Sequence, residues 1–402
     1  MQKISEFMEK IGCKKYPERW SEFFEEVYND FEKNGCELLN PGYYDELHRK
    51  YGMLGEFLDA YKLCAKEISK NKDLSVYLHL WKRAMQDRDK IMEDVYAYSL
   101  PQLPKGLDPI AINLLCGLVM CSQADYCYSI LKARNIPDNM IKEIMKKPEA
   151  GTKRYFERNN GEYGYSLFSW YQLAVDAKLY NVNRFQIEIG SPFGFNVKVY
   201  KNQNNKYITL ADGLDVHSSG YILGSLYFED DNNSWHASIT EDKDYIYGYT
   251  FGEDALLKKE LVKLPKDEWA LVLSKDDPVV ILHIPAEGKF TPEIVDESLK
   301  DIKVFLKTYF PDYKYKTFAT ASWFFDPQNE NLLPPESNIL KFAKRFNRFA
   351  IKDWGKSAFS FVFQKDNPVI EELPENTSLQ RAMKKHFLSG KTIYNFGGYF
   401  FE

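Results

Sequence analysis

The sequence predicts an α+β protein of two domains: a helical N-terminal domain, residues 1–152, and a larger domain, residues 153–402, in which helices cover the faces of a mixed, mostly antiparallel sheet. Apolar residues recur at helical spacing through the first 150 or so positions, and after residue 180 they alternate in short runs typical of strands. A chain of 402 residues is also longer than one ordinary domain of roughly 100–200 residues.

The pattern of the first domain is a succession of amphipathic helices separated by turn residues. The proline- and glycine-containing segment 101–106 interrupts this pattern, as such segments do. The expected helices are, in order, one at 17–31, one at 54–64, a long one from Asp73, its cap, to Tyr98, one at 108–131, and a shorter one after Pro137.

The second domain is expected to begin with an aromatic-rich helix at 165–180 that packs with the sheet. Alternating runs predict the first strands, at 184–189, 196–200 and 206–210. The later elements are expected to be a central strand at 279–284, a helix at 291–309, a strand at 316–325, a helix at 337–345, strands near 349 and at 359–363, a helix at 377–388 and a last strand at 392–400.

Two of these strands, 279–284 and 316–325, are expected to lie side by side and parallel. The helix between them is long enough for a right-handed crossover, and strands joined in this way are buried. Thr291 is its predicted cap, with Pro292 at the first helical position.

Composition and charge exclude several classes of protein. The net charge of −5 argues against a general nucleic-acid binder, which needs a basic face. The sequence contains no run of eighteen apolar residues, so we expect no membrane span. The charged N-terminus does not resemble a signal peptide. All six cysteines lie in the first third without C-x-x-C spacing, so we expect buried, reduced thiols and a cytoplasmic protein. The oligomeric state is not indicated.

Several segments resemble a bacterial two-domain family of N-acyltransferases, which has a helical N-terminal domain and a GNAT-like C-terminal domain. Four segments occur in the family's order and with similar gaps: Leu264–Trp269 (LPKDEW), Leu282–Gly288 (LHIPAEG), Ser322–Trp323, and Ser337–Phe342 (SNILKF). Residues 170–188 are similar to the start of that domain, and 126–137 to part of the helical domain. The resemblance spans most of the chain.

The resemblance implies a function as well as a fold. The co-substrate would be acyl-CoA or acetyl-CoA, inserted where the two central strands splay apart, with its pyrophosphate at the start of the following helix. The family's usual phosphate loop is Gln or Arg, two residues, Gly, one residue, then Gly or Ala; here only Gly288 remains, and Glu287 adds negative charge. The residues assigned to acyl-CoA by this resemblance are Ile284, Gly288, Lys289, Thr291 and Trp323.

The candidate catalytic residues lie on or beside the central strands. His283, the only titratable residue in 279–284, is expected either to accept the proton of an amine or to be a structural histidine. Glu188 is the alternative base, acting through water. Gln186 shares a strand face with Glu188 and would hold the acceptor, or both would face solvent. Ser322 would bind the acyl carbonyl or the thiol side of the ligand, and no G-x-S-x-G pattern makes it a nucleophile.

A metal site is not expected. Asp212, Asp215 and His217 form a turn-rich cluster without the calcium-loop pattern, and His236 lies on a predicted strand.

Three functions therefore stay open. The first is an N-acyltransferase that moves an acyl group from acyl-CoA to a small-molecule amine. The second is a non-catalytic GNAT-like module that binds a ligand. The third is an interaction protein that docks partners on its helical domain. The departure of the phosphate loop from the usual pattern favours the second, and the order of the elements favours the first.

Overall fold

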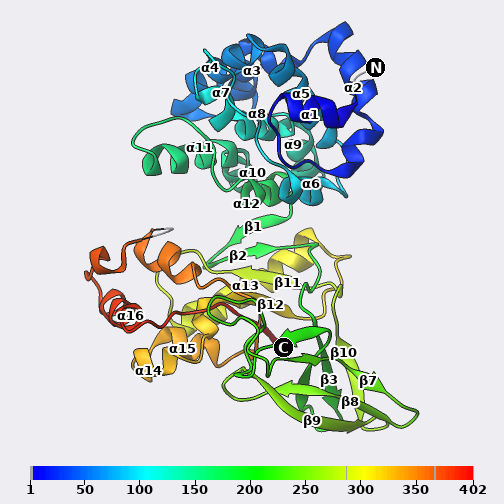
Figure 1. Ribbon diagram of the computed structural model, residues 1–402, viewed down its shortest axis with the longest axis vertical. Helices are drawn as coiled ribbons and strands as arrows, with labels where there is room; N and C mark the ends of the chain where they lie inside the picture. The colour runs from blue at the N-terminus through cyan, green and yellow to red at the C-terminus, as the bar shows by residue number, and fades with distance from the viewer. Residues whose placement is uncertain (1–2, 287, 366–367, 402) are drawn as a thin grey trace. The chain divides into compact units, whose positions relative to one another are not determined.

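The computed structural model describes residues 3–286, 288–365 and 368–401, and the chain divides into two compact units, Met1–Tyr180 and Asn181–Glu402 (Figure 1). The division falls later than the boundary expected at residue 152. Helix α12, Phe168–Val175, packs on α6, α8, α10 and α11 of the first unit, so the prediction that this helix belongs with the sheet is wrong. Its apolar side chains complete the helical core, which a change of period along the chain does not reveal.

The first unit is helical throughout, with three short 3-10 segments at Glu18–Glu22, Glu37–Leu39 and Gly55–Phe57. Its α-helices are α1 Ile4–Lys10, α2 Phe24–Asn34, α3 Pro41–Tyr51, α4 Leu58–Ser69, α5 Lys72–Ala84, α6 Ile91–Ala97, α7 Ile110–Asn113, α8 Leu115–Cys121, α9 Ala124–Ala133, α10 Asp138–Met145, α11 Lys147–Arg158 and α12.

The predicted long helix from Asp73 to Tyr98 is two helices, α5 and α6. Asn71, not Asp73, caps α5, because its side chain accepts a hydrogen bond from the backbone N–H of Leu74 at 3.0 Å. The predicted helix at 108–131 is likewise divided, into α7, α8 and α9.

Aromatic rings and thiols fill the core of the helical unit. The rings of Trp20 and Trp81 meet edge to face with centroids 4.9 Å apart, and both side chains are fully buried. All six cysteines are buried and unpaired, as the sequence predicts. Burial raises the pKa of several of these thiols, that of Cys127 to about 12, so they are core residues and not nucleophiles.

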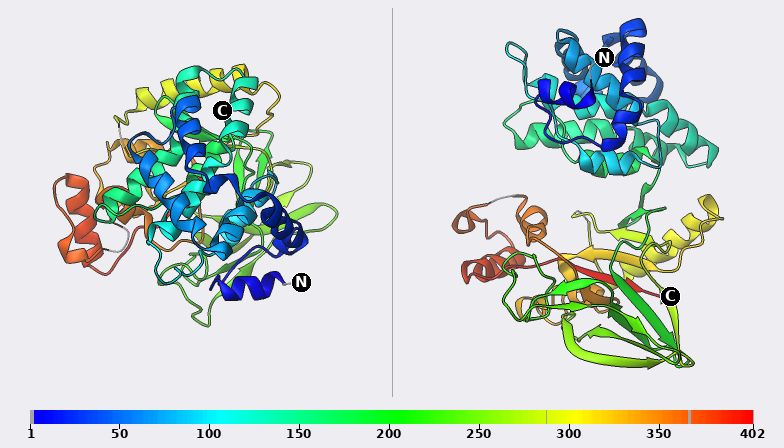
Figure 2. Two further views of the ribbon diagram at one scale, coloured as in Figure 1. Left: turned by 90° about the horizontal axis from the view of Figure 1, so that it is seen from above. Right: turned by 45° about the vertical axis from the view of Figure 1, so that its right-hand side comes forward.

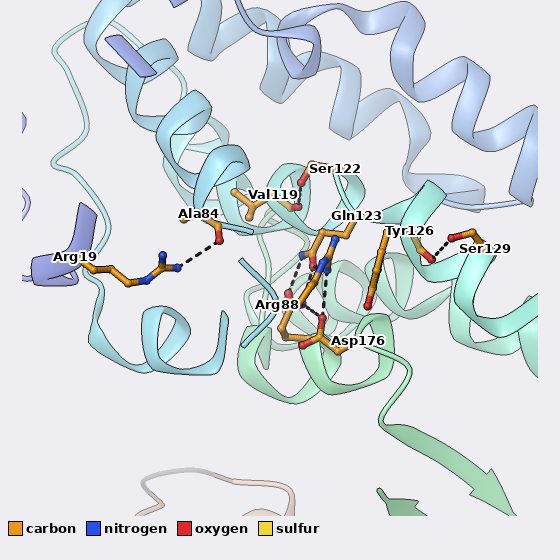
Figure 3. Close-up of polar contacts among 10 residues, drawn as sticks. Arg19, Ala84, Arg88, Val119, Ser122, Gln123, Tyr126, Ser129 and Asp176 are labelled. Carbon is orange, nitrogen blue, oxygen red and sulfur yellow. Dashed lines mark hydrogen bonds and ion pairs between the residues drawn. The ribbon is translucent and has the colours of Figure 1, made fainter. Parts of the chain in front are cut away.

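A polar network holds the last turn of α12 (Figure 3). Arg88, in the turn between α5 and α6, donates to Gln123 at 2.7 Å and to the carboxylate of Asp176 at 3.3 Å, and its guanidinium lies 3.6 Å from the ring centroid of Tyr126. The amides of Gln123 and Gln172 bond each other at 2.8 Å. Asp176 is buried, and burial raises the pKa of its carboxyl. The turn between α5 and α6 thus places the guanidinium of Arg88 beside the buried carboxylate of Asp176.

The second unit contains two six-stranded sheets and a two-stranded ribbon. The first sheet has the order β1-β2-β11-β12-β14-β13, and the second the order β10-β3-β4-β8-β7 with β9 paired to β8. The strands are β1 Leu179–Val182, β2 Phe185–Glu188, β3 Val197–Asn202, β4 Tyr207–Ala211, β5 Leu214–Val216, β6 Trp235–Ala237, β7 Thr240–Glu241, β8 Tyr245–Phe251, β9 Leu257–Pro265, β10 Trp269–Leu273, β11 Val280–His283, β12 Phe318–Ser322, β13 Asn347–Ala350 and β14 Phe396–Phe400.

The main core of this unit lies between the two sheets. Ala319, Phe349 and Tyr399 of the first sheet pack against Val199 and Leu273 of the second. Gly397 of β14 leaves the space that Phe349 fills, since a Cβ atom there would lie 2.3 Å from the phenyl ring. This packing fixes the position of the central strands.

The helices of the second unit include α13 Pro292–Tyr309 (yellow in Figures 1 and 2), α14 Asn329–Leu332, α15 Asn338–Ala343 and α16 Ser378–Leu388, with 3-10 segments at Trp323–Phe325 and Ile370–Glu372. Thr291 caps α13 through the N–H of Ile294, and Pro292 occupies its first position, as predicted. The α+β class, with a helical part followed by a mixed, mostly antiparallel sheet, is confirmed.

One predicted strand is wrong. Residues Phe359–Phe363 form a π-helix. Phe359 and Phe363 both contact Phe387 of α16, with ring centroids 4.3 and 6.2 Å apart. A short aromatic run predicts a strand equally well, and contact with a distant helix decides the conformation.

Candidate active site

Strands β11 and β12 are parallel neighbours, as predicted, but they pair over a short stretch. The paired positions are Val280 with Phe318 and Ile281 with Ala319. Beyond Ile281, β11 continues to His283 while still pairing with β2, and β12 continues to Ser322 while pairing with β14. The two central strands therefore part at their carboxyl ends.

His283 lies on β11 where the strands have parted. Its Nε2 atom is 2.8 Å from Oε2 of Glu188 on β2. The antiparallel register sets His283 opposite Gln186 and Ile281 opposite Glu188, so the two side chains are diagonal neighbours on one face. This contact joins the two residues that the sequence offers as alternative bases, His283 and Glu188.

One hydroxyl group bonds the carboxylate of Glu188, and a second hydroxyl is influenced by its charge. Ser191, in the turn after β2, donates a hydrogen bond to Oε1 of Glu188. Tyr313 donates to the carbonyl of Val279 at 2.6 Å and accepts from the N–H of Gly190 at 3.2 Å. Burial raises the pKa of the Tyr313 hydroxyl, and the negative charge of Glu188 adds to the effect. Glu188 is thus a buried, hydrogen-bonded carboxylate.

The loop between β11 and α13 contains the residues that the sequence assigns to the phosphate groups. Gly288 has φ +93°, a conformation that favours glycine, and Lys289 follows it. Glu287 lies outside the described residues. Ile284, directly after β11, is half-buried.

Arg184, which sequence reasoning did not select, holds this loop. Its guanidinium donates to the carbonyl oxygens of Pro285, at 2.7 Å, and of Lys289, at 3.0 Å. Arg184, Gly288, Lys289 and Glu297 are among the residues that line a hollow of about 440 Å³ at the start of α13. No motif marks Arg184, and its only signal is a cation at the start of an alternating run.

The other residues that the sequence suggests for the site lie on β2, at the end of β12 and directly after β12. Gln186 shares the His283 face and donates to the side chain of Asn181 at 2.7 Å. The hydroxyl of Ser322 accepts from the N–H of Phe324 at 3.1 Å. Trp323 is buried in a cluster with Met383 and Phe387, which is a packing role. The residue type of Ser337, directly before the apolar helix 337–345, is typical of an N-cap, but its side chain makes no capping bond at the start of α15.

The histidines named above lie in small hydrogen-bonded groups. His217 contacts Ser219 and Asp231, and His236 contacts Asp215. Within residues 3–286, 288–365 and 368–401, no three His, Cys, Asp or Glu side chains gather as metal ligands would. Within the same residues, no helix combines the length and the apolar character needed to cross a bilayer.

Comparison with known proteins agrees with this architecture. Residues 221–400 match the model of the GNAT-like C-terminal domain family. No curated protein matches the sequence significantly.

Three solved structures show the same fold over nearly the whole chain. An acyltransferase in complex with decanoyl-CoA has a TM-score of 0.56 and 18% identity over 94% of this chain and 98% of its own. An acyltransferase mutant with octanoyl-CoA has a TM-score of 0.58 and 17% identity, over 99% of both chains. An acyltransferase with decanoyl-CoA and teicoplanin has a TM-score of 0.57 and 18% identity, over 100% of this chain and 99% of its own.

The family match, the parted central strands and the shared fold agree with the resemblance found in the sequence. Residues 221–400 of this chain are therefore similar to the GNAT-like C-terminal domain family, and the helical unit, Met1–Tyr180, lies earlier in the chain.

Proposed function

We propose that this protein is an acyltransferase that moves an acyl group from acyl-CoA to the amine of a small-molecule acceptor. The observation that carries this proposal is the place of His283: it lies on β11 beyond the last residue pair that joins β11 to β12, and Glu188 bonds its ring. The solved acyltransferases of the same fold contain decanoyl-CoA or octanoyl-CoA, which supports an acyl-CoA donor.

In this proposal the donor enters between the parted strands. The pairing of β11 with β12 joins Val280 to Phe318 and Ile281 to Ala319, and the proposal places the amides of pantetheine beside the strand ends that follow these pairs. The phosphates would lie at the start of α13, where free N–H groups and the helix dipole favour anions. The residues proposed for the donor are Ile284, Gly288, Lys289, Thr291 and Trp323, with Trp323 acting through packing.

The proposed chemistry is direct transfer. An amine is protonated near neutral pH and must lose a proton before its nitrogen attacks the thioester carbonyl. The C–N bond then forms, the C–S bond breaks, and CoA leaves as a thiolate. His283 takes the amine proton, and Glu188 keeps the ring oriented and balances its positive charge. After the attack the nitrogen loses its second proton, which converts the CoA thiolate to the thiol, and His283 releases the first proton to solvent.

Two further residues complete the proposed site. Gln186 lies opposite His283 on the neighbouring strand and would hold the acceptor amine. Ser322 lies at the end of β12, across the parting of the strands, and its hydroxyl would donate to the thioester carbonyl or to the sulfur. No covalent acyl-serine is part of the proposal.

The test is donor binding followed by turnover. Acetyl-CoA, octanoyl-CoA, decanoyl-CoA and CoA would be titrated calorimetrically, and thiol release would be followed with a simple primary amine or teicoplanin as the acceptor. The proposal expects micromolar binding of at least one acyl-CoA and acceptor-dependent release of CoA. Binding without any turnover would favour a non-catalytic module that binds a ligand. The absence of binding would favour the third function, an interaction protein.

A further inference from the structure

We infer that Arg184 is a positioning residue for acyl-CoA, which braces the loop between β11 and α13 and presents a positive charge to the phosphate groups of the donor. The inference rests on the proposed function and deepens it, because it explains how a loop that keeps only Gly288 of the usual signature is held in place. The observations are the contacts of the Arg184 side chain, its charge balance and the hollow beside it.

The contacts of Arg184 join three elements of the second unit. Its guanidinium bonds the carbonyl oxygens of Pro285 and Lys289, at 2.7 and 3.0 Å, and lies 5.0 Å from the ring centroid of Phe290. Its backbone N–H donates to Oγ of Ser298 at 3.2 Å, and Ser298 in turn donates to the carbonyl of Ile294 at 2.6 Å. One residue thus attaches the start of β2 to the loop and to the first turns of α13.

The geometry of this brace suits arginine. A planar guanidinium bonds two acceptors at once in a fixed arrangement, whereas a lysine ammonium is a point charge on a flexible stem. When the carbonyl oxygens of Pro285 and Lys289 turn towards Arg184, the loop is held by a side chain. In the usual phosphate loop, glycines shape the backbone instead.

Within the described residues, the positive charge of Arg184 has no carboxylate partner. Both of its acceptors are uncharged carbonyls, and among the described residues no carboxylate forms an ion pair with it. Burial lowers the pKa of Arg184, yet a guanidinium stays protonated at neutral pH. Lys289 adds a second cation to the hollow of about 440 Å³, while Glu297 lies on its α13 side. A phosphate-bearing ligand would supply an anionic partner for Arg184, which the described residues do not.

A comparison of two acyl donors distinguishes a role of Arg184 in phosphate binding from a general effect on catalysis. Octanoyl-CoA carries the phosphates, and octanoyl-pantetheine carries the same thioester without them. We expect Arg184→Gln to raise the KM for octanoyl-CoA roughly 10- to 100-fold with little change in kcat, the loss expected for bonds to a charged group. The kcat/KM for octanoyl-pantetheine should stay unchanged.

Arg184→Lys keeps the charge and loses the two-acceptor brace, so its KM for octanoyl-CoA should lie between those of wild type and Arg184→Gln. Arg345→Gln is the matched control, because Arg345, which follows α15, pairs with Asp296 of α13, and no described contact joins Arg345 to the loop. Equal losses with both donors, or an unchanged KM for octanoyl-CoA, would overturn the inference.

Hydrogen exchange of the ligand-free protein tests the brace independently of any activity. The amides of Gly288, Lys289 and Phe290 should exchange faster in Arg184→Gln than in wild type or in Arg345→Gln, and equal exchange would refute the brace. If wild type neither binds nor uses any acyl-CoA, the proposed function fails and the phosphate role of Arg184 fails with it. The exchange experiment then still decides whether Arg184 holds the loop.

Discussion

The Nε2 atom of His283 lies 2.8 Å from Oε2 of Glu188, although 95 residues separate the two positions along the chain. The antiparallel pairing of β2 with β11 makes them diagonal neighbours, and Ser191 bonds the other oxygen of the same carboxylate. The fold therefore fixes the orientation of the imidazole ring at the point where β11 leaves β12.

The first prediction concerns the proton acceptor. His283→Ala should lower kcat roughly 10²- to 10⁴-fold, the usual contribution of a general base, while the affinity for octanoyl-CoA stays nearly constant. Steady-state kinetics and calorimetric titration measure the two effects separately. His236→Ala, which removes an exposed histidine paired with Asp215, is the control and should be fully active. Full activity of His283→Ala would end its candidacy, and loss of folding would mark it as a structural residue.

The second prediction concerns the residue that holds the histidine. Glu188→Gln should lower kcat roughly 10- to 100-fold with little change in KM, because a neutral amide orients the ring less firmly and does not balance its positive charge. Ser191→Ala should have a smaller effect of the same kind. Ser337→Ala removes a hydroxyl that makes no capping bond and serves as the matched control. An unchanged kcat in Glu188→Gln would show that the contact has no part in turnover.

The third prediction concerns pH. Burial raises the pKa of the Asp326 carboxyl from 3.8 to about 6, even though the N–H groups of Tyr394 and Gln328 bond it. Because the folded state binds this proton more tightly than the unfolded state, the group stabilises the fold below about pH 4 and loses that contribution as pH rises through about 6. The free energy of unfolding of wild type, relative to Asp326→Asn, should fall by roughly 3 kcal/mol across this window.

Urea unfolding at several pH values checks this difference. Asp312→Asn, at an exposed position, is the control, and its difference from wild type should not show the same fall. A flat difference for Asp326→Asn would contradict the assignment.

The fourth prediction concerns the stability of the helical unit. Arg88→Ala leaves the carboxylate of Asp176 buried without its cation, which should cost roughly 2–4 kcal/mol, below the upper limit for buried pairs because Arg88 is partly exposed. Adding Asp176→Asn should recover part of that loss. Lys132→Ala, which breaks an exposed pair with Asp138, should change stability by less than about 1 kcal/mol. Thermal unfolding measures the stability of these three variants. If Asp176→Asn adds to the loss caused by Arg88→Ala instead of recovering part of it, Arg88 does not stabilise the fold through Asp176.

Local sequence signals were sufficient to predict the secondary-structure elements around the candidate site. The apolar run of β11, the Thr291–Pro292 start of α13 and the apolar run of β12 all follow from residue type and spacing, because caps and fixed backbone angles act over a few residues. The parallel pairing of the two strands follows from the length and handedness of their connection. These predictions are confirmed.

Other elements depended on distant contacts. The π-helix at Phe359–Phe363 faces α16, and α12 completes the core of the helical unit. Neither fact is encoded within the segment itself, since an aromatic run suits more than one conformation and a helix does not specify its partner. The expected cap at Asp73 was displaced to Asn71, two residues earlier, because both residue types cap helices well.

The sequence by itself determined the class of this protein, the order of its central elements and the presence of His283 on a buried strand. Only the tertiary structure decided that Glu188 and Ser191 lie beside His283 and that Arg184 reaches across to the loop before α13. The reason is physical: periodicity and capping are local properties of the chain, whereas these contacts depend on strand register and on how the sheets pack, which involve residues about a hundred positions apart.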